Sequence, residues 1–354
     1  MIKAERGKIK REYLKQAGEI IRQGGLVAFP TETVYGLGGD ALNPHSSEKI
    51  YEAKGRPSDN PLIVHICAME DLEKIVKDVP EEAYRLAEAF WPGPLTMIFQ
   101  KKDCVPAQTT GGLDTVAVRM PNHDLALEFI QASGGFIAAP SANRSGRPSP
   151  TMAEHVYEDL KGKIEMILDG GEVGIGLEST IVDMTVFPPV ILRPGYINEQ
   201  MLRQVLEQVE MDRGLLPDQG TLHPKAPGMK YRHYAPRAEM MLVEGKEKIA
   251  AEKIIELADQ EEMQGKRVGI ISCEEHKNWY LEHLKKESHP LEILKIAGSL
   301  KQEETIAHNL YRILREFDEE KAEVIFSEVF ETPTMGTAIM NRLRKAAGQK
   351  IIKC

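Results

Sequence analysis

The chain has 354 residues, and at about 150 residues per domain this length predicts two domains. Apolar residues make up 42% and charged residues 28%, values typical of a globular protein with a sizeable core, so a disordered, collagen-like or disulfide-scaffold chain is excluded. No apolar run approaches the roughly 18–20 residues of a membrane span, and the charged N-terminus lacks the apolar region of a secretory signal. We therefore expect a cytoplasmic protein with no membrane segment.

Charge and cysteine content narrow the class further. The net charge is −9, from 45 basic and 54 acidic side chains, and almost all of the acidic excess falls in residues 1–216. This balance disfavours a protein that coats nucleic acid through bulk electrostatics. Four cysteines lie far apart without a CxxC pair, which suits a reducing compartment and argues against a zinc ribbon or a disulfide framework.

The first two thirds of the chain alternate strand and helix patterns. Residues 11–23 have the apolar spacing of an amphipathic helix, which Gly24-Gly25 ends, and residues 26–29 form a short apolar strand. Strands separated by helices predict an α/β sheet covered on at least one face. Further strands are predicted at 62–66, 95–99, 115–119, 136–139, 164–168, 179–183 and 190–193, and helices at 46–54, 80–90, 122–132, 151–161 and 198–208.

The pattern changes at residues 211–237, which contain four prolines and three glycines and show no periodicity. We predict an extended inter-domain segment here, and long structureless segments often act as lids or binding loops. The predicted domains are therefore 1–211, a linker and lid at 212–237, and 238–354.

A second α/β alternation follows the linker. It predicts a small Rossmann-like domain with a parallel sheet, and because it lacks a GxGxxG turn we do not expect a dinucleotide. Its strands are predicted at 239–243, 267–272, 291–296 and 322–327, and its helices at 246–263, 276–286, 303–317 and 336–347.

Two polar motifs lie early in the chain. Residues 30–40, PTETVYGLGGD, follow a buried strand and have hydroxyls and backbone amides that could hold a polar ligand, although judged alone a tight strand-to-helix turn is the simpler interpretation. Residues 54–62, KGRPSDNPL, place Lys54 and Arg56 two residues apart, where the two cations could bind a polyphosphate. The alternative is a solvated loop, which Pro57 and Pro61 weaken because they fix the geometry of both cations.

Two more motifs follow later strands. Residues 140–151, PSANRSGRPSPT, offer serines, an asparagine and two arginines after a strand, which suits a nucleotide phosphate site, and Ser and Asn oxygens are suitable Mg²⁺ ligands. Residues 171–181, GEVGIGLESTI, are not a Rossmann fingerprint because no helix is predicted after them. With Arg193, Thr115 and Arg119 these motifs collect cations and hydroxyls, while no Ser-His-Asp order, HExxH or Walker A sequence is present. The combination indicates binding and positioning chemistry rather than a covalent protein nucleophile.

The histidines form no metal-ligand spacing. His65 lies in an apolar strand, where a hydrogen-bonded structural role is usual. Seven others are expected at the surface: His45, His123, His155, His276, His283, His289 and His308.

Taken together, the motifs resemble a known family. PTETVYGLG, KGRPSDNPLIVH, SANRSGRPSPT, GLESTIVD and LRPG resemble the YrdC-like domain of threonylcarbamoyl-AMP synthases. APGMKYRHYAP and MGTAIMNRLRKAA resemble the linker and C-terminal domain of the longer, two-domain form of bacteria, archaea and fungi. The resemblance implies a YrdC-like twisted open sheet with a large concave cavity, followed by the smaller Rossmann-like domain.

The family activity implied is synthesis of L-threonylcarbamoyladenylate from L-threonine, bicarbonate or CO₂, and ATP, with release of pyrophosphate. The product supplies N6-threonylcarbamoyladenosine at position 37 of tRNAs that read ANN codons. A separate tRNA threonylcarbamoyl transferase complex performs that transfer, so direct tRNA binding by this chain is not expected.

The resemblance also implies residue roles. Two cations are expected to be catalytic: Lys54, which would lie near the phosphates, and Arg56. A Mg²⁺ is expected near Ser141 and Asn143. Tyr234 is expected on a lid over the nucleotide. From the chemistry, Arg119 suits the threonine carboxylate, and a closed site would protect a carbamate that is unstable in water. The threonine site would comprise Thr33, His65, Arg119, Ala139 and Ser179, and the ATP site Arg56, Asn60, Thr115, Ser141, Ser149, Arg193 and Tyr234.

Two other classes are weighed against this one. An RNA-binding module would grip double-stranded RNA or tRNA on a concave basic surface, but the acidic first domain and the lack of aromatic-interleaved basic stretches count against it. A carbamoyl-transfer protein of the hydrogenase-maturation type shares the YrdC-like fold. Such proteins carry an acylphosphatase-like segment and zinc-finger cysteine pairs, and neither is found in this sequence.

Overall fold

The computed structural model describes residues 2–3, 10–215, 234–284 and 292–354. The chain divides into two compact units, the first comprising residues 1–145 and 149–231 and the second residues 146–148 and 232–354. Most of the predicted linker, residues 216–233, lies outside the described residues, so the exact limits of the predicted lid stay a prediction.

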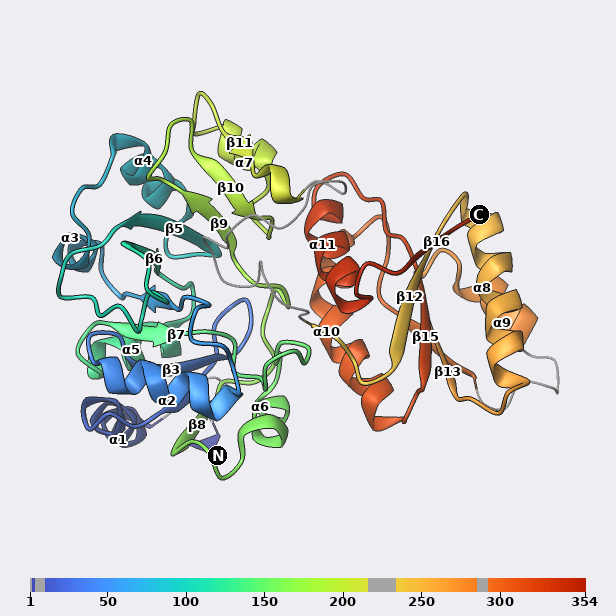
Figure 1. The fold of residues 1–354 in the computed structure, drawn as a ribbon, viewed down its shortest axis with the longest axis horizontal. Coiled ribbons are helices and arrows are strands. Elements are labelled where there is room, and N and C mark those ends of the chain that lie inside the picture. Colours follow the sequence, from blue (N-terminus) through green and yellow to red (C-terminus); the bar gives the residue numbers. More distant parts are fainter. Residues whose placement is uncertain (1, 4–9, 216–233, 285–291) are drawn as a thin grey trace. The chain divides into compact units, whose positions relative to one another are not determined.

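The first unit is built on one mixed sheet of eleven strands (Figure 1). Their order is β1-β8-β2-β3-β7-β4-β6-β5-β9-β10-β11, so strands far apart in sequence become neighbours. The strands are β1 (Ile2–Lys3), β2 (Val27–Phe29), β3 (Gly36–Asp40), β4 (Ile63–His65), β5 (Leu95–Gln100), β6 (Thr115–Arg119), β7 (Ile137–Ala139), β8 (Met166–Asp169), β9 (Thr180–Asp183), β10 (Val190–Arg193) and β11 (Glu210–Met211).

Helices cover both faces of the sheet around β2. Successive residues of a strand point to opposite faces, so neighbouring residues of β2 pack against different helices. Val27 and Phe29 lie in the apolar cluster that contains residues of α1 and α5, whereas Ala28 lies in the larger cluster with residues of α2, α4 and α6. The helices of this unit are α1 (Arg11–Arg22), α2 (Pro44–Lys54), α3 (Leu72–Ile75), α4 (Glu81–Phe90), α5 (Asp124–Ala132), α6 (Ala153–Leu160) and α7 (Glu199–Arg203).

Strand β3 was not predicted, because its sequence GLGGD is poor in strand-forming residues. Its glycines serve close packing instead. A Cβ on Gly38 would lie 2.9 Å from the Ile137 side chain, and one on Gly36 would lie 3.1 Å from the Phe29 ring. The motif at 30–40 therefore turns back as an antiparallel strand beside β2 rather than entering a helix.

The helix predicted at 198–208 is shorter than expected, because α7 ends at Arg203. Asn198 caps it by accepting a hydrogen bond from the Met201 amide at 2.9 Å. Leu202 and Leu206 are both buried, which mimics helical spacing, but the chain turns between them and runs parallel to β10 as β11. The apolar spacing thus predicted correctly that these residues are buried, but it predicted a helix that is too long.

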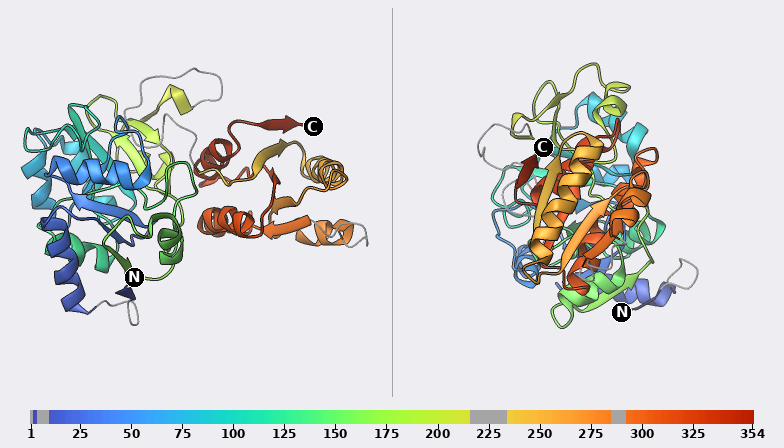
Figure 2. Two further views of the ribbon diagram at one scale, coloured as in Figure 1. Left: turned by 60° about the horizontal axis from the view of Figure 1, so that its bottom comes forward. Right: turned by 90° about the vertical axis from the view of Figure 1, so that its right-hand side faces the viewer.

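The second unit has a five-stranded, wholly parallel sheet in the order β14-β13-β15-β12-β16, which confirms the predicted parallel α/β domain. Helices α8 and α9 cover one face of the sheet and α10 and α11 the other (Figure 2). The strands are β12 (Glu239–Glu244), β13 (Val268–Ser272), β14 (Glu292–Ile296), β15 (Val324–Glu328) and β16 (Ile351–Lys353), and the helices are α8 (Glu247–Glu262), α9 (Lys277–Leu284), α10 (Glu303–Glu319) and α11 (Gly336–Ala346).

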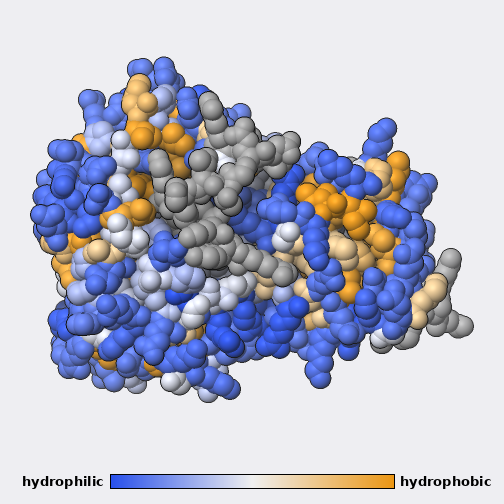
Figure 3. All heavy atoms as spheres, in the orientation of Figure 1, coloured by the Kyte–Doolittle hydropathy of each residue, from blue (hydrophilic) through white to orange (hydrophobic). Residues whose placement is uncertain are grey.

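Hydrophilic residues predominate on the face of the first unit drawn in Figure 3, and apolar residues gather there only in small patches. Among the described residues, no helix combines the length and apolar character needed to cross a bilayer. The buried His155 corrects the expectation that it lies at the surface, since its ring nitrogen accepts a hydrogen bond from the Thr151 amide at the start of α6.

Candidate functional site

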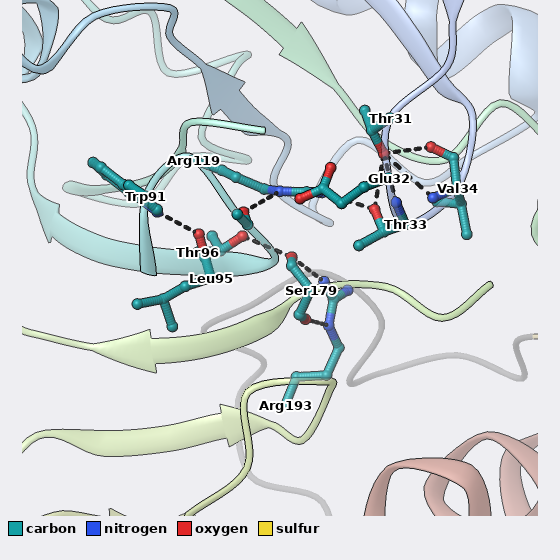
Figure 4. Close-up of polar contacts among 11 residues, drawn as sticks. Thr31, Glu32, Thr33, Val34, Trp91, Leu95, Thr96, Arg119, Ser179 and Arg193 are labelled. Atoms are coloured by element: carbon teal, nitrogen blue, oxygen red, sulfur yellow. Dashed lines mark hydrogen bonds and ion pairs between the residues drawn. The ribbon is translucent and has the colours of Figure 1, made fainter. Parts of the chain in front are cut away.

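The loop between β2 and β3 is held in a tight turn by its own hydroxyl groups. The Thr31 hydroxyl accepts hydrogen bonds from the amides of Thr33 and Val34 at 3.2 and 3.3 Å and donates to the Val34 carbonyl. This is the local turn that Ser and Thr favour when they bond neighbouring backbone groups. The turn leaves the side chains of Glu32 and Thr33 directed toward β6 (Figure 4).

Arg119, at the end of β6, meets that turn. Its Nη1 donates to the Thr33 hydroxyl at 3.0 Å, its Nε donates to the Gly93 carbonyl at 3.2 Å, and its Nη2 lies 2.7 Å from the Glu32 carboxylate (Figure 4). Both ionic side chains are removed from solvent, with 5% of Arg119 and 13% of Glu32 exposed. Nevertheless, neither Arg119 Nη2 nor either Glu32 oxygen has a well-aligned hydrogen-bond partner. The pair is close in space but its hydrogen-bonding capacity is unmet.

Ser179, directly before β9, connects two further site residues. Its hydroxyl shares a hydrogen bond of 2.7 Å with the Thr96 hydroxyl and accepts from Arg193 Nη2 at 3.1 Å, while Arg193 Nε donates to the Ser179 carbonyl at 3.0 Å (Figure 4). The pairing of β10 with β9 shifts register between Ile191 and Arg193, a local irregularity of the kind that re-aims a side chain. Gly195 allows the close approach, because a Cβ there would lie 2.5 Å from the Thr180 nitrogen.

The loop at 171–176 packs along the turn at 31–35. The amides of Ile175 and Gly176 donate to the carbonyls of Glu32 and Thr33 at 2.8 and 3.1 Å. The Tyr35 hydroxyl donates to the Gly171 carbonyl at 2.7 Å. The glycine-rich motif therefore fixes the backbone of the turn from which Glu32 projects.

The third motif meets the end of α2. The Lys54 ammonium donates to the backbone carbonyls of Ser141 and Asn143, and the Ser141 hydroxyl donates to the Asn143 side-chain oxygen at 2.5 Å. Gly55 makes this possible by ending α2 in the left-handed conformation, with φ of 61°, and the next amide returns to the Tyr51 carbonyl. Lys54, expected near the phosphates, is thus in direct contact with Ser141 and Asn143, which were expected near Mg²⁺.

Arg56 and Asn60 lie on the loop that follows. The Arg56 guanidinium donates to the carbonyls of Asn60 and Pro61 at 3.2 Å, so the cation is held against its own loop. The Asn60 side chain is 2% exposed, and neither its oxygen nor its nitrogen has a hydrogen-bond partner. Buried amides normally have hydrogen-bond partners, so Asn60 has capacity for bonds that its protein neighbours do not make.

His65 pairs in register with Arg119 on the neighbouring strand. Its ring is buried, and burial together with the nearby Arg119 charge lowers the pKa of His65 to about 3. The imidazole is therefore uncharged at neutral pH. A ring nitrogen lies 3.2 Å from the Ile63 carbonyl, which agrees with the hydrogen-bonded role expected from the sequence.

Three other residues predicted for the threonine and ATP sites lie on different elements of the first unit. Ala139 pairs with Ile63 and packs against Gly36, and the Ser149 hydroxyl donates to Glu178 at 2.6 Å, next to Ser179. Thr115 begins β6 at the opposite end from Arg119, about 13 Å away along the strand.

Tyr234 belongs to the second unit rather than the first. Its ring is 5% exposed, stacks on the Tyr311 ring with 5.2 Å between centroids, and lies near the Arg342 guanidinium. Its expected role over the nucleotide stays a prediction.

Three residues of this site were not assigned from the sequence: Glu32, Thr96 and Glu178. Glu32 and Glu178 stand inside recognised motifs, and a carboxylate beside so many cations was the signal available. Thr96 gave no signal, because only the parallel pairing of β5 with β9 brings it to Ser179.

The arrangement can hold a small molecule with both charges. A buried guanidinium and a buried carboxylate lie side by side, and several hydroxyls surround them. A second group of polar residues around Lys54 offers cations and oxygen atoms of the kind that bind phosphates.

Comparison with known proteins agrees with these features. A family model described as "Telomere recombination" matches residues 19–195, and one described as "Threonylcarbamoyl-AMP synthase, C-terminal domain" matches residues 197–348. The threonylcarbamoyl-AMP synthase of Pyrococcus abyssi is 48% identical over 351 residues, which are 98% of this chain and 98% of the relative. That of Bacillus subtilis is 48% identical over 341 residues, which are 96% of this chain and 94% of the relative.

A solved structure of the P. abyssi protein Sua5 complexed with L-threonine has a TM-score of 0.90 to this chain at 47% identity, covering 100% of this chain and 99% of that one. The match includes both α/β units, and it confirms the fold and family expected from the motifs. The chain belongs to the threonylcarbamoyl-AMP synthase family of enzymes, in its two-domain form.

Proposed function

We propose that this enzyme makes L-threonylcarbamoyladenylate from L-threonine, bicarbonate or CO₂, and ATP, releasing pyrophosphate. The observation that carries the proposal is the buried pair of Arg119 and Glu32, whose facing atoms lack aligned hydrogen bonds. Buried ionised groups are normally hydrogen-bonded, so unmet capacity on both members marks the place of a ligand with two charges.

An amino acid supplies the two charges that the pair requires. Its carboxylate would bind Arg119 Nη2, since the other guanidinium nitrogens are already held by Gly93 and Thr33. Its ammonium group would bind the Glu32 carboxylate. The L-threonine bound to the P. abyssi relative agrees with this chemistry.

Threonine also carries a hydroxyl, and the site is rich in groups that could bind it. The hydroxyls of Thr31 and Thr33 lie 2.9 Å apart, and those of Thr96 and Ser179 lie 2.7 Å apart. A buried hydroxyl left unpaired costs about 1–3 kcal/mol, so sites that bind a substrate hydroxyl discriminate against analogues without it. We expect serine or threonine to be preferred over valine.

The nucleotide would lie along the cations of the neighbouring loops. Lys54, Arg56 and Arg193 would neutralise charge on the triphosphate, as cations do in phosphoryl transfer. The unpartnered amide of Asn60 would complete its hydrogen bonds on ATP. Ser141 and Ser149 stand on the loop between β7 and α6, where a strand end provides a phosphate site.

The residues expected to hold Mg²⁺ fit an ion that arrives with the nucleotide. Ser141 and Asn143 offer neutral oxygens, and these already surround the Lys54 ammonium. Mg²⁺ favours carboxylates and phosphates and keeps several waters, so phosphate oxygens would supply most of its ligands here. When bound, the ion would neutralise negative charge on the phosphates, a task that Lys54 shares.

The reaction then needs two bond-forming steps. The threonine ammonium gives up one proton to become a neutral amine, whose nitrogen bonds to the carbon of CO₂ and releases a second proton to solvent, giving a carbamate. A carbamate oxygen bonds to the α-phosphorus while the bond to the leaving pyrophosphate breaks. The residues of this chain would contribute positioning and charge neutralisation, which suits a site without a protein nucleophile in the sequence motifs.

The product would supply the threonylcarbamoyl group of N6-threonylcarbamoyladenosine in tRNA through a separate transferase complex. The acidic balance of residues 1–216 disfavours direct tRNA binding by this chain.

The experiment is mass spectrometry of the products formed from ATP, isotope-labelled bicarbonate and single amino acids. We expect label in an adenylate together with pyrophosphate release only when threonine, or more weakly serine, is present. ATP turnover that does not depend on an amino acid, or label that never enters an adenylate, would overturn the proposal.

A further inference from the structure

Three side chains with metal-binding atoms converge in the second unit, and none of them belongs to the site residues described above. Cys273 directly follows β13, His276 lies in the loop before α9, and Glu328 ends β15. One potential ligand atom from each lies within 4.8 Å of the others. Among the described residues, this is the one group of three or more His, Cys, Asp or Glu side chains arranged in this way.

The topology explains why they meet. β13 and β15 are parallel neighbours, so their carboxyl ends lie at the same edge of the sheet. The chain continues from β13 into α9 and from β15 into α11, and these helices cover opposite faces of the sheet (Figure 2). In open α/β sheets, ligands bind in the crevice that forms where such connections diverge.

The three side chains are removed from solvent. Cys273 is 0% exposed, Glu328 is 5% exposed, and 17% of the His276 side chain is exposed. Glu328 is oriented by its neighbours, since it accepts a hydrogen bond from the Ser272 hydroxyl at 2.8 Å and lies 2.7 Å from His276 Nδ1. Such outer contacts orient the ligands of protein metal sites.

A fourth side chain with a buried hydroxyl lies beside the cluster. Tyr280 on α9 is 0% exposed, and its hydroxyl has no aligned hydrogen-bond partner. The hydroxyl lies close to the Glu328 carboxylate but is not aligned with it. A water molecule bound to a metal ion at the cluster would supply the hydrogen bond that this hydroxyl lacks.

We propose that Cys273, His276 and Glu328 bind a zinc ion in the second unit. Thiolate, imidazole and carboxylate are the ligand types of protein zinc sites, and the ion would take a water as its fourth ligand. On binding, the Cys273 thiol loses its proton to solvent and a zinc–sulfur bond forms, so the two anionic ligands balance the ion's charge. Tetrahedral ligand atoms lie about 3.4 Å apart, so the His276–Glu328 hydrogen bond gives way to two metal bonds.

The sequence did not suggest this site. Cys273 and His276 are three residues apart, but Glu328 follows His276 by 52 residues, and only the pairing of β13 with β15 joins them. The alternative is a hydrogen-bond network among the same side chains that binds no metal.

The test uses the full-length chain without a histidine tag. The protein is treated with a chelator, dialysed, supplied with Zn²⁺, freed of excess metal on a desalting column, and analysed for metal by mass spectrometry. We expect about one zinc per chain, and with Co²⁺ instead a near-ultraviolet charge-transfer band from the thiolate–cobalt bond.

The variants Cys273→Ser and His276→Ala separate the site from surface binding. Each should reduce retained zinc at least about tenfold, since each removes a direct ligand. Cys273→Ser should also abolish the cobalt band, because it removes the thiolate, and His276→Ala should weaken the band in proportion to the cobalt it fails to retain. The matched control Cys354→Ser alters an exposed cysteine of the same unit and should retain zinc as the parent chain does. If Cys273→Ser fails to fold, His276→Ala, whose ring is part-exposed, carries the test.

Three results would overturn the proposal: no zinc retained by the parent chain, retention that both variants preserve, or a cobalt spectrum without a thiolate band. The readout is metal content and not synthase activity, so this test is independent of the proposed reaction.

Discussion

Arg119 is a single residue whose guanidinium group is held in place by its neighbours. Two of its nitrogens are held by Gly93 and Thr33, which leaves Nη2 to face Glu32. A planar guanidinium fixed in this way binds a carboxylate with defined geometry, which a lysine could not reproduce. The unmet hydrogen bonds of the pair are the part of this site that most directly indicates a charged substrate.

The role of Glu32 is tested by the variant Glu32→Gln. The amide keeps the size of the side chain but loses the charge that would bind the threonine ammonium. A hydrogen bond between charged groups contributes about 1.5–3 kcal/mol, so we expect the KM for threonine to rise about 10–100-fold while the KM for ATP stays within about twofold. Steady-state kinetics with each substrate varied in turn measures both.

Glu88→Gln is the control, because Glu88 is an exposed carboxylate on α4. A Glu32→Gln enzyme with an unchanged threonine KM, or with equal losses for both substrates, would contradict the proposed ammonium site.

His65 makes a prediction about stability and pH. Its pKa is lowered to about 3 in the folded chain, first by burial and then by Arg119. The unfolded chain therefore binds a proton near pH 6.5 that the folded chain does not, so His65 makes the protein lose stability as the pH falls below about 6.5. At pH 5.5 this loss is about 1.4 kcal/mol relative to neutral pH.

The measurement is urea unfolding at pH 7.5 and pH 5.5 of the parent chain and of His65→Gln, both carrying Trp279→Phe so that the fluorescence comes from Trp91 of the first unit. The variant should lose about 1.4 kcal/mol less than the parent between the two pH values, since glutamine does not titrate. Equal losses in both proteins would show that the imidazole is not buried in its neutral form.

At the scale of the element, the end of α2 decides where Lys54 and Arg56 lie. Gly55 adopts φ of 61°, and a Cβ at this position would meet no atom within 4 Å. Substitution with alanine therefore introduces backbone strain without a clash, of about 1–2 kcal/mol. Because the strain falls between two candidate phosphate-binding cations, it should also disturb nucleotide binding.

Gly134→Ala provides a matched control for Gly55→Ala. Gly134 also has a positive φ, 106°, and open space around its missing Cβ, but it follows α5, whose buried residues pack with those of α1 and not with those of α2. We expect both variants to lose similar stability in thermal unfolding and only Gly55→Ala to raise the KM for ATP. A KM that rises equally in both, or in neither, would show that the helix end does not position the cations.

Whether a segment is a helix or a strand was mostly predictable from its local pattern of apolar residues. The two elements predicted incorrectly have a common cause. Strand β3 was missed because its glycines are chosen for contact with Phe29 and Ile137, which are on other strands. Helix α7 was predicted too long because Leu202 and Leu206 are buried by the sheet and not by a continuing helix. In both cases the residue types are explained by contacts with other parts of the fold. The periodicity of one segment carries no information about the segment against which it packs.

At the scale of the whole molecule, the lid predicted from the sequence is open to a direct test. Tyr234→Ala should lower the yield of adenylate per ATP consumed, because an uncovered carbamate is lost to water. Tyr311→Ala is the comparison, since it removes the ring on which Tyr234 stacks. Product and free nucleotide are quantified by chromatography of the same reaction.

If Tyr234 acts only in packing, the two variants should behave alike. A larger loss of coupling in Tyr234→Ala than in Tyr311→Ala would support the lid. An unchanged yield of adenylate per ATP consumed in both variants would rule out the lid.

The sequence by itself determined the family, the α/β class of both units and most members of the candidate site, because motifs and periodicity are local properties of the chain. Only the tertiary structure decided which of these residues touch. Arg119 reaches Thr33 across 86 residues, Ser179 reaches Thr96 across 83, and Glu328 reaches His276 across 52. Such pairings depend on strand order in a sheet, and strand order is set by the packing of the entire unit.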